Sequence, residues 1–128
     1  MRALLDSHAF LWWVLDAPDL STRCRDILSD GENDIALSAA SVYEIAYKAT
    51  QGRLVLPEGP DTYLRDRIVA NDFHTLPIET SHALLAATLP AIHRDPFDRI
   101  LVAQAQLEAM PILTADPAIA RYDVEVIW

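Results

Sequence analysis

Short apolar runs alternate with segments of helical character along nearly the whole chain. The expected strands are residues 2–6, 34–38, 73–78, 111–116 and 124–128. The expected helices are residues 7–16, 21–31, 39–52, 61–72, 80–90 and 95–110, with a loop at 53–60 that carries proline and glycine. A strand, a helix and a second strand form a parallel βαβ unit, and repeated units place helices on both faces of one sheet. The sequence therefore predicts an α/β fold with a mainly parallel sheet.

The size and composition of the chain fit one globular domain that spans residues 1–128. The chain has 128 residues and a hydrophobic content of 52%, which is enough to bury a core. No stretch reaches the roughly eighteen uninterrupted apolar residues that cross a bilayer, so we expect no membrane association. The single cysteine, Cys24, cannot form an internal disulfide, which predicts a reducing compartment such as the cytoplasm.

The charge balance is strongly acidic. Asp and Glu outnumber Lys and Arg by 19 to 10, and the formal net charge is −9. Affinity for phosphates usually comes from Lys and Arg, so this balance excludes a protein that coats nucleic acid through a generally basic surface. It does not exclude an enzyme whose acids bind metal ions, because the ions bring the positive charge. An acidic surface also suits a basic protein partner.

Four of the acids stand out by their positions. Asp6 and Asp116 each close an apolar strand, and the carboxyl ends of parallel strands meet at one edge of a sheet. Glu44 has mostly apolar or aromatic neighbours in "SVYEIAYK", and Asp98 lies one turn inside the helix that contains "FDRILVAQA". Two carboxylates about 5 Å apart repel by roughly 3 kcal/mol at an effective dielectric constant near 20. If the four acids converge, a hard cation such as Mg²⁺ or Mn²⁺ would offset that repulsion.

Each acid also has an ordinary structural explanation. An acid in the first turn of a helix is favoured by the helix dipole, and Asp95 has the position of a helix N-cap. Asp6 has the position of an N-cap as well, although the expected cap of the first helix is Ser7. Glu44 could face solvent and pair with Lys48, four residues later. Two acids that close strands at the same edge of the sheet nevertheless favour a shared site.

The histidines and glycines give no sign of other common sites. His8, His74, His82 and His93 lack the spacing H-x-x-x-H, and the chain has no C-x-x-C pair, so a zinc site is not expected. A P-loop, a G-x-G-x-x-G motif and a G-x-S-x-G motif are also absent from the sequence. The acids therefore remain the strongest chemical signal.

Four blocks of the sequence resemble those of PIN-domain proteins, and in particular of VapC-type toxins from type II toxin–antitoxin pairs. The blocks are "LLDSHAFLWW", "LSAASVYEIAYK", "DPFDRILVAQA" and "ILTAD", in the family's order and spacing. The resemblance covers essentially the whole chain. It implies a PIN-like three-layer α/β/α sandwich around the parallel sheet, and a ribonuclease that depends on Mg²⁺ or Mn²⁺.

The resemblance also assigns roles to residues. The family's catalytic acids fall on a set of four residues: Asp6, Glu44, Asp98 and Asp116. Three of these, Asp6, Asp98 and Asp116, are the implied metal ligands. The implied supporting residues are Thr114, Ser41, Asp95 and Arg99, the last as a phosphate contact or a partner in an internal ion pair. Together they would activate a water for in-line attack on an RNA phosphodiester, with a 3′-hydroxyl as the leaving group.

The family further implies partners. We expect an RNA substrate, a cognate antitoxin protein that covers the acidic groove, and a homodimer. The aromatic residues Trp12, Trp13, Tyr43 and Tyr47 are candidates for anchoring such partners or for filling the core. Candidate phosphate contacts are Arg23, Arg25, Lys48, Arg53 and Arg94. The alternative is a PIN-like fold without turnover that binds RNA or protein, although all four acidic positions are filled.

Overall fold

The structure, a computed structural model, describes residues 1–128 and contains five strands and six α-helices. The strands are β1 (Arg2–Leu5), β2 (Asp34–Ser38), β3 (His74–Leu76), β4 (Ile112–Leu113) and β5 (Val126–Ile127). The helices are α1 (Ser7–Val14), α2 (Thr22–Ser29), α3 (Ala39–Thr50), α4 (Pro60–Ala70), α5 (Thr80–Thr88) and α6 (Pro96–Glu108), with a 3₁₀ turn at Ile119–Arg121. Every expected strand and helix is present, mostly with shorter bounds. None of the helices is both long enough and apolar enough to cross a membrane.

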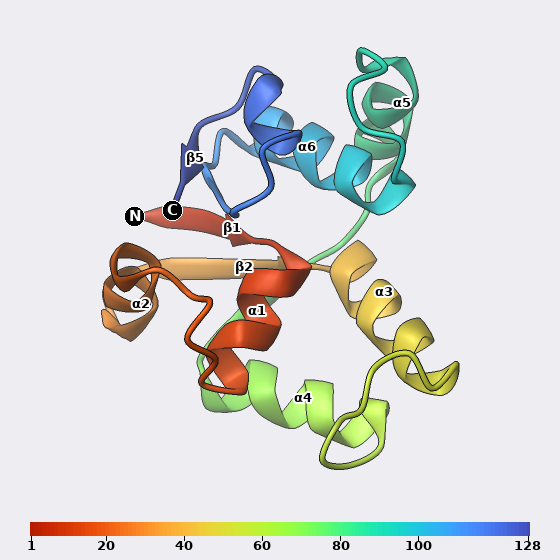
Figure 1. The fold of residues 1–128 in the computed structure, drawn as a ribbon. Helices are drawn as coiled ribbons and strands as arrows, with labels where there is room; N and C mark the ends of the chain where they lie inside the picture. Colours follow the sequence, from red (N-terminus) through yellow and green to blue (C-terminus); the bar gives the residue numbers. More distant parts are fainter.

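All strand pairs are parallel, and the sheet has the order β3-β2-β1-β4-β5. From β1 the chain adds strands first on one side and later on the other, so the order of the strands reverses at β1 and β4. In open parallel sheets such a switch point leaves a crevice at the carboxyl ends of the strands. Strand β1 leads directly into α1 and strand β2 directly into α3 at that edge (Figure 1).

Alternate residues of the strands face two separate cores. Along β1, Ala3 and Leu5 join the core that includes helices α1, α2 and α4, whereas Leu4 joins the core beneath α5 and α6. In β4 the same division separates Leu113 from Ile112. The helices thus form layers above and below the sheet (Figure 1), and the predicted three-layer α/β/α sandwich is confirmed. Strands buried on both faces explain why the apolar runs are continuous rather than alternating.

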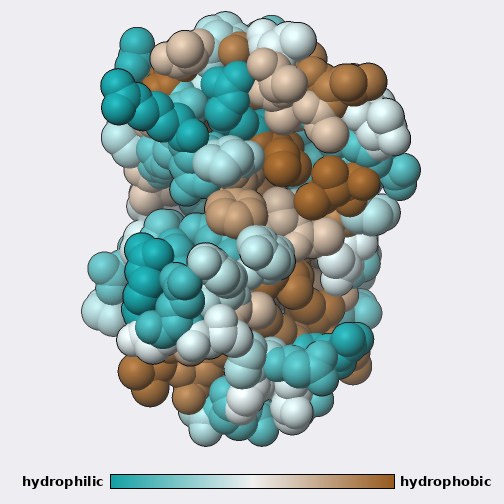
Figure 2. Space-filling view, turned by 90° about the vertical axis from the view of Figure 1, so that its right-hand side faces the viewer, coloured by the Kyte–Doolittle hydropathy of each residue, from teal (hydrophilic) through white to brown (hydrophobic).

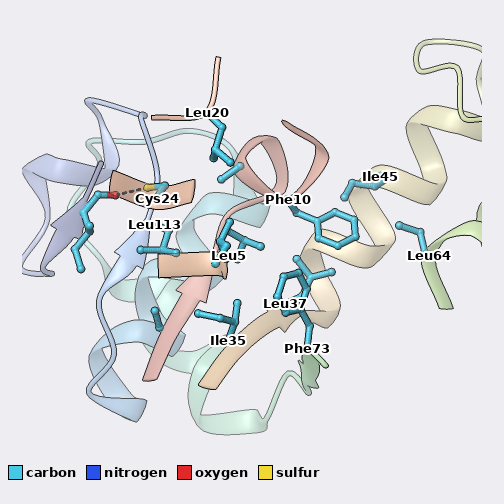
Figure 3. Packing of buried hydrophobic residues seen from close by; sticks show 14 residues of the cluster. Leu5, Phe10, Leu20, Cys24, Ile35, Leu37, Ile45, Leu64, Phe73 and Leu113 are labelled. Carbon is cyan, nitrogen blue, oxygen red and sulfur yellow. Dashed lines mark hydrogen bonds between the residues drawn. The ribbon is translucent and has the colours of Figure 1, made fainter. Parts of the chain in front are cut away.

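Phe10 fixes α1 against the sheet. Its side chain is fully buried, and its ring meets the ring of Phe73 edge to face, with 6.3 Å between the centroids. Figure 3 shows it between Leu37 of the sheet and Ile45 of α3. Because α1 begins directly after Asp6, the packing of this ring also sets where the first acid lies.

Phe10→Ala should lower the free energy of unfolding by about 3–5 kcal/mol, because it leaves a cavity in a closely packed core. Urea unfolding followed by circular dichroism measures the change. Leu84→Ala is the matched control, since Leu84 lies on α5 with 66% of its surface exposed, and should change stability by less than about 0.5 kcal/mol. Equal losses in the two variants would contradict this account of the core.

Candidate active site

The pairing of β1 with β4 brings the two strand-end acids together. Leu5 and Leu113 are register partners, and the Asp6 N–H donates to the Leu113 carbonyl at 3.2 Å. The hydroxyl of Thr114 donates to Asp6 Oδ2 and accepts from the Asp116 N–H at 3.0 Å. One hydroxyl therefore fixes both segments just beyond the strand ends.

Asp6, rather than Ser7, is the N-cap of α1. Its Oδ1 atom accepts a hydrogen bond from the Ala9 N–H at 2.7 Å, so the prediction that Ser7 caps this helix is wrong. The physical reason is that Asp6, at the end of β1, already places a carboxylate oxygen against a free N–H of the first turn. The Ser7 hydroxyl instead donates to Glu44 Oε1 at 2.7 Å and thereby links α1 to α3.

Glu44 is a buried acid with two hydrogen-bond donors. Its side chain is only 8% exposed, and Lys48 Nζ lies 2.8 Å from its Oε2 atom. The pairing with Lys48 that the sequence suggested is present, but Glu44 does not face solvent. Ser41 is also buried, one turn earlier in α3, and makes no hydrogen bond with any of the four acids. Helix α3 thus places the Glu44 carboxylate, fixed by Ser7 and Lys48, near the edge of the sheet.

His93 joins two of the predicted acids. Its Nε2 atom lies 2.9 Å from Asp116 Oδ2 and 3.1 Å from Asp98 Oδ2. The Asp95 N–H donates to its Nδ1 atom at 3.2 Å, so in the neutral ring the proton is on Nε2 and points between the two carboxylates. Ligand atoms of His93, Asp98 and Asp116 all lie within 4.8 Å of one another.

No sequence pattern selects His93 or Ser7 as a residue of the site. His93 lies in the loop between α5 and α6, and no regular spacing relates it to Asp98 and Asp116, which it reaches only because the loop folds over the strand ends. The position of Ser7 predicts a helix cap, which is the usual role of serine before a helix. Neither residue has a local signal that would have identified it.

The acids repel one another in a poorly solvated place. Burial, followed by the charge of Asp95, raises the pKa of Asp98 to about 7, with further contributions from Glu44 and Asp116, and only the nearby His93 opposes the rise. Burial also raises the pKa of Asp6, with a smaller contribution from Asp116, against the lowering effect of the Thr114 hydrogen bond. Partial burial alone would lower the pKa of His93, but its hydrogen bond to Asp116 and the surrounding carboxylates raise it.

Oxygen donors that raise one another's pKa fit a divalent cation. Asp98 and Asp116 supply oxygen atoms, which Mg²⁺ and Mn²⁺ prefer, and these atoms lie within 4.8 Å of each other and of His93. An added positive charge would stabilise the ionised form of Asp98 that burial now disfavours. The chemistry of these two acids therefore fits the divalent metal expected from the sequence, whereas both oxygens of Asp6 already accept hydrogen bonds.

Two of the predicted supporting residues have structural roles. Asp95 is the N-cap of α6, as predicted, and accepts from the Phe97 N–H at 2.9 Å. Of the two roles implied for Arg99, the internal ion pair is absent, and the phosphate contact stays a prediction. Its two terminal nitrogens donate to four backbone carbonyls at 2.8–3.3 Å, namely those of Ala86, Leu89, Pro90 and His93. Arg99 thus closes the end of α5 and holds the loop that carries His93.

A model of the PIN domain family matches residues 3–125. The chain belongs to the PIN-domain family. Its resemblance to PIN-domain proteins is thereby confirmed over nearly the whole length.

Individual relatives agree with this membership. The chain is 39% identical to the ribonuclease VapC16 of Mycobacterium tuberculosis over 67 residues, which is 52% of this chain and about half (46%) of that relative. Among solved structures, FitAcB from Neisseria gonorrhoeae matches with a TM-score of 0.68 and 22% identity, over 100% of this chain and 97% of that one. VapBC2 from Rickettsia felis, bound to a DNA fragment from its promoter, matches with a TM-score of 0.70 and 13% identity, over 99% and 98%. At such identities the structural likeness shows the fold alone.

The metal-free PIN domain should lose stability as the pH rises. The pKa of Asp98 is about 7 in the folded protein against an ordinary value of 3.8. Between these values the folded state keeps a proton that the unfolded state has released, so the free energy of unfolding falls as the pH rises toward about 7 and this contribution is constant above it. We expect Asp98→Asn, which cannot ionise, to have a higher Tm than the wild type near pH 8.

Thermal unfolding in EDTA at several pH values measures this difference. The two Tm values should lie closest together near pH 3, where Asp98 is mostly protonated in both states because its ordinary pKa is 3.8. Asp66→Asn is the matched control, because Asp66 is exposed on α4 and should give no such pH-dependent gain. A difference between wild type and Asp98→Asn that does not change with pH would contradict the electrostatic account.

Arg99→Ala should lower the free energy of unfolding by about 2 kcal/mol or more, because carbonyls at the end of α5 lose their charged donor. Arg99→Lys should recover only part of the loss, since an ammonium group cannot reproduce the planar fork. Denaturant unfolding measures both. The control is Arg94→Ala, because the exposed side chain of Arg94 forms no hydrogen bond or ion pair. Equal stability of the two alanine variants would contradict a stabilising role for the Arg99–carbonyl hydrogen bonds.

Proposed function

We propose that this PIN domain is a metal-dependent endoribonuclease that acts as the toxin of a toxin–antitoxin pair. The observation that carries the proposal is the convergence of acids from separate parts of the chain at one edge of the sheet. Asp98 and Asp116 lie on the two sides of His93, and Thr114 connects Asp116 with Asp6. Membership in the PIN-domain family and the similarity to a ribonuclease support the same conclusion.

The proposed metal ligands are Asp6, Asp98 and Asp116. When bound there, a Mg²⁺ or Mn²⁺ ion would stabilise charge that develops on the phosphate and make a water more acidic at neutral pH. Thr114 would orient Asp6 and oppose the rise that burial causes in its pKa, because a hydrogen bond to a carboxylate favours the charged form. His93 would keep Asp98 and Asp116 close together through its Nε2–H.

Glu44 would orient the attacking water rather than bind the metal directly. Ser7 and Lys48 each hold one of its oxygens, and an oxygen that accepts one hydrogen bond still has a second lone pair for a water proton. In-line attack would then cut the RNA phosphodiester with the 3′-hydroxyl as leaving group. The products would carry a 5′-phosphate and a 3′-hydroxyl.

An antitoxin is the proposed protein partner. FitAcB, VapBC2 and a toxin–antitoxin complex from Klebsiella pneumoniae are among the solved structures that share this fold. An apolar groove of about 630 Å³ between α3 and α4, whose lining includes Val42, Ala46, Leu64 and Ile68, supports a partner that buries an apolar face. The net charge of −9 suits basic groups on the same partner. A homodimer remains part of the proposal on the basis of the family resemblance.

The alternative, a PIN-like module that binds RNA or protein without turnover, is less well supported. A fold that has lost catalysis has no reason to keep buried acids that raise one another's pKa. Such an arrangement costs stability. Carboxylates with perturbed pKa values in a cleft are typical of functional sites. The distinction is experimental.

Antitoxin-free protein should cut bacterial RNA at discrete positions with Mg²⁺ or Mn²⁺ and not in EDTA. Asp98→Asn and Asp116→Asn should each lower the rate by about 100-fold or more, since the loss of even an outer hydrogen-bond partner of a metal ligand costs about 10–100-fold. Sequencing of the cut ends gives the target and the end chemistry. The control is Asp66→Asn, which removes the same charge at an exposed position of α4.

Metal-induced stabilisation separates the two functions when no cleavage is seen. A folded protein that gains about 2.7 kcal/mol at a metal concentration 100-fold above the Kd has a real site. No gain and no cleavage with either metal would reject the proposed nuclease and favour the binding module. Cleavage that survives Asp98→Asn would mean that the active site has been placed incorrectly or that a contaminant cuts.

A further inference from the structure

Three aromatic rings form a row beside the acids. Tyr43 and Tyr47 are stacked on α3, with 5.7 Å between their centroids and 9° between their planes. Phe97, at the start of α6, lies 5.6 Å from Tyr43. We call Tyr43, Tyr47 and Phe97 the aromatic row.

The two tyrosines of the aromatic row are exposed to solvent. Tyr43 is 58% exposed and Tyr47 is 45% exposed, although stacked rings of this size usually contribute to a core. The spacing of four residues explains why the two tyrosines are neighbours on the helix, but not why both rings face solvent. A second surface that covers these faces would remove the apolar area from water.

The aromatic row lies beside one of the proposed catalytic acids. Tyr47 and Phe97, the two ends of the row, line the same hollow as Glu44, and Phe97 directly precedes Asp98. Figure 2 views the side of the molecule on which the strands end, and hydrophobic and hydrophilic side chains are intermixed there. A polymer held at the acids would therefore pass the rings.

Positive charge lies next to the same row. Lys48 and Arg53 line a hollow of about 260 Å³ together with Glu44, Tyr47, Asp95 and Phe97. Lys48 pairs with Glu44, whereas the exposed side chain of Arg53 forms no hydrogen bond or ion pair within the chain. The hollow also contains two acids, Glu44 and Asp95, so Arg53 is the cation there whose charge is available to a phosphate.

We propose that the aromatic row is a stacking platform for unpaired bases of single-stranded RNA, and that Lys48 and Arg53 contact the backbone phosphates of the same strand. This inference rests on the proposed function and names a binding determinant next to its acids. Aromatic faces with interspersed cations are the usual means of holding single strands without reading their sequence. Bases within a duplex already stack on one another, so their faces are not available to the rings. An apolar protein segment could also pack on the rings, but it has no phosphate to pair with Arg53.

The test measures binding of a short single-stranded RNA of mixed sequence by fluorescence anisotropy. The protein carries Asp98→Asn throughout and is studied with Mg²⁺, so that the probe stays intact. Tyr43→Ala combined with Tyr47→Ala should weaken binding by about tenfold or more, because each lost base–ring stack costs roughly 5-fold or more. Tyr43→Phe with Tyr47→Phe should keep the affinity. Tyr43→Leu with Tyr47→Leu keeps apolar bulk without a ring face and should behave like the alanine pair.

Two comparisons show whether the effect comes from stacking. On a probe of equal length with abasic sites in place of the bases, the alanine pair should bind as well as the parent protein, since no base is left to stack. Leu84→Ala, on exposed α5, should leave binding of the intact probe unchanged. Equal affinity of the parent and the alanine pair for the intact probe would overturn the platform.

The outcome for the platform is distinguishable from that for the nuclease. If the wild type cuts RNA but the tyrosine variants bind and cut equally well, the platform is wrong and the proposed function stands. If the rings matter for binding but the wild type cuts nothing, the platform stands and the nuclease fails. If the tyrosine variants change only the molecular mass in sedimentation, the row is an interface between copies of this chain, and the platform is rejected.

Discussion

The parallel pairing of β1 with β4 is the constraint on which the proposed site depends. It joins Leu5 to Leu113 across more than a hundred residues of chain and places Asp6 beside Thr114. The threonine hydroxyl donates to the Asp6 carboxylate and accepts from the Asp116 N–H, so it fixes the two strand ends relative to each other. The strands themselves are held by two apolar cores, one on each face of the sheet. Core packing therefore sets the position of the acids.

The same arrangement places charged groups where water is scarce. Burial is the largest cause of the raised pKa values of Asp6 and Asp98, and neighbouring acids add to it. His93, which lies in a loop, reduces the repulsion between these acids. Arg99 binds backbone carbonyls of that loop and so positions His93. The packing of the sheet and helices offsets the unfavourable free energy of these buried, repelling acids. Such local costs are common at functional sites.

Much of the fold could be predicted because its signals are local. The inner strands β1, β2 and β4 are mostly apolar runs, and several helices begin at residues such as Ser21, Asp95 and Pro96 whose local chemistry favours a helix start. The main error at this level was Ser7. Serine is a good cap by propensity, but the aspartate before it is also a good cap and already lies at the strand end. The competition between two adequate residues was decided by where the sheet places Asp6.

The sequence by itself determined the alternation of strands and helices and the parallel α/β class, and it selected Asp6, Glu44, Asp98 and Asp116 as candidates for one site. It also identified Asp95 as a cap, since that role needs only neighbouring residues. Only the tertiary structure decided that His93 lies between Asp98 and Asp116, that Arg99 binds carbonyls, and that Tyr43 and Tyr47 leave their rings exposed beside Glu44. These facts depend on contacts between distant parts of the chain, for which local pattern carries no information.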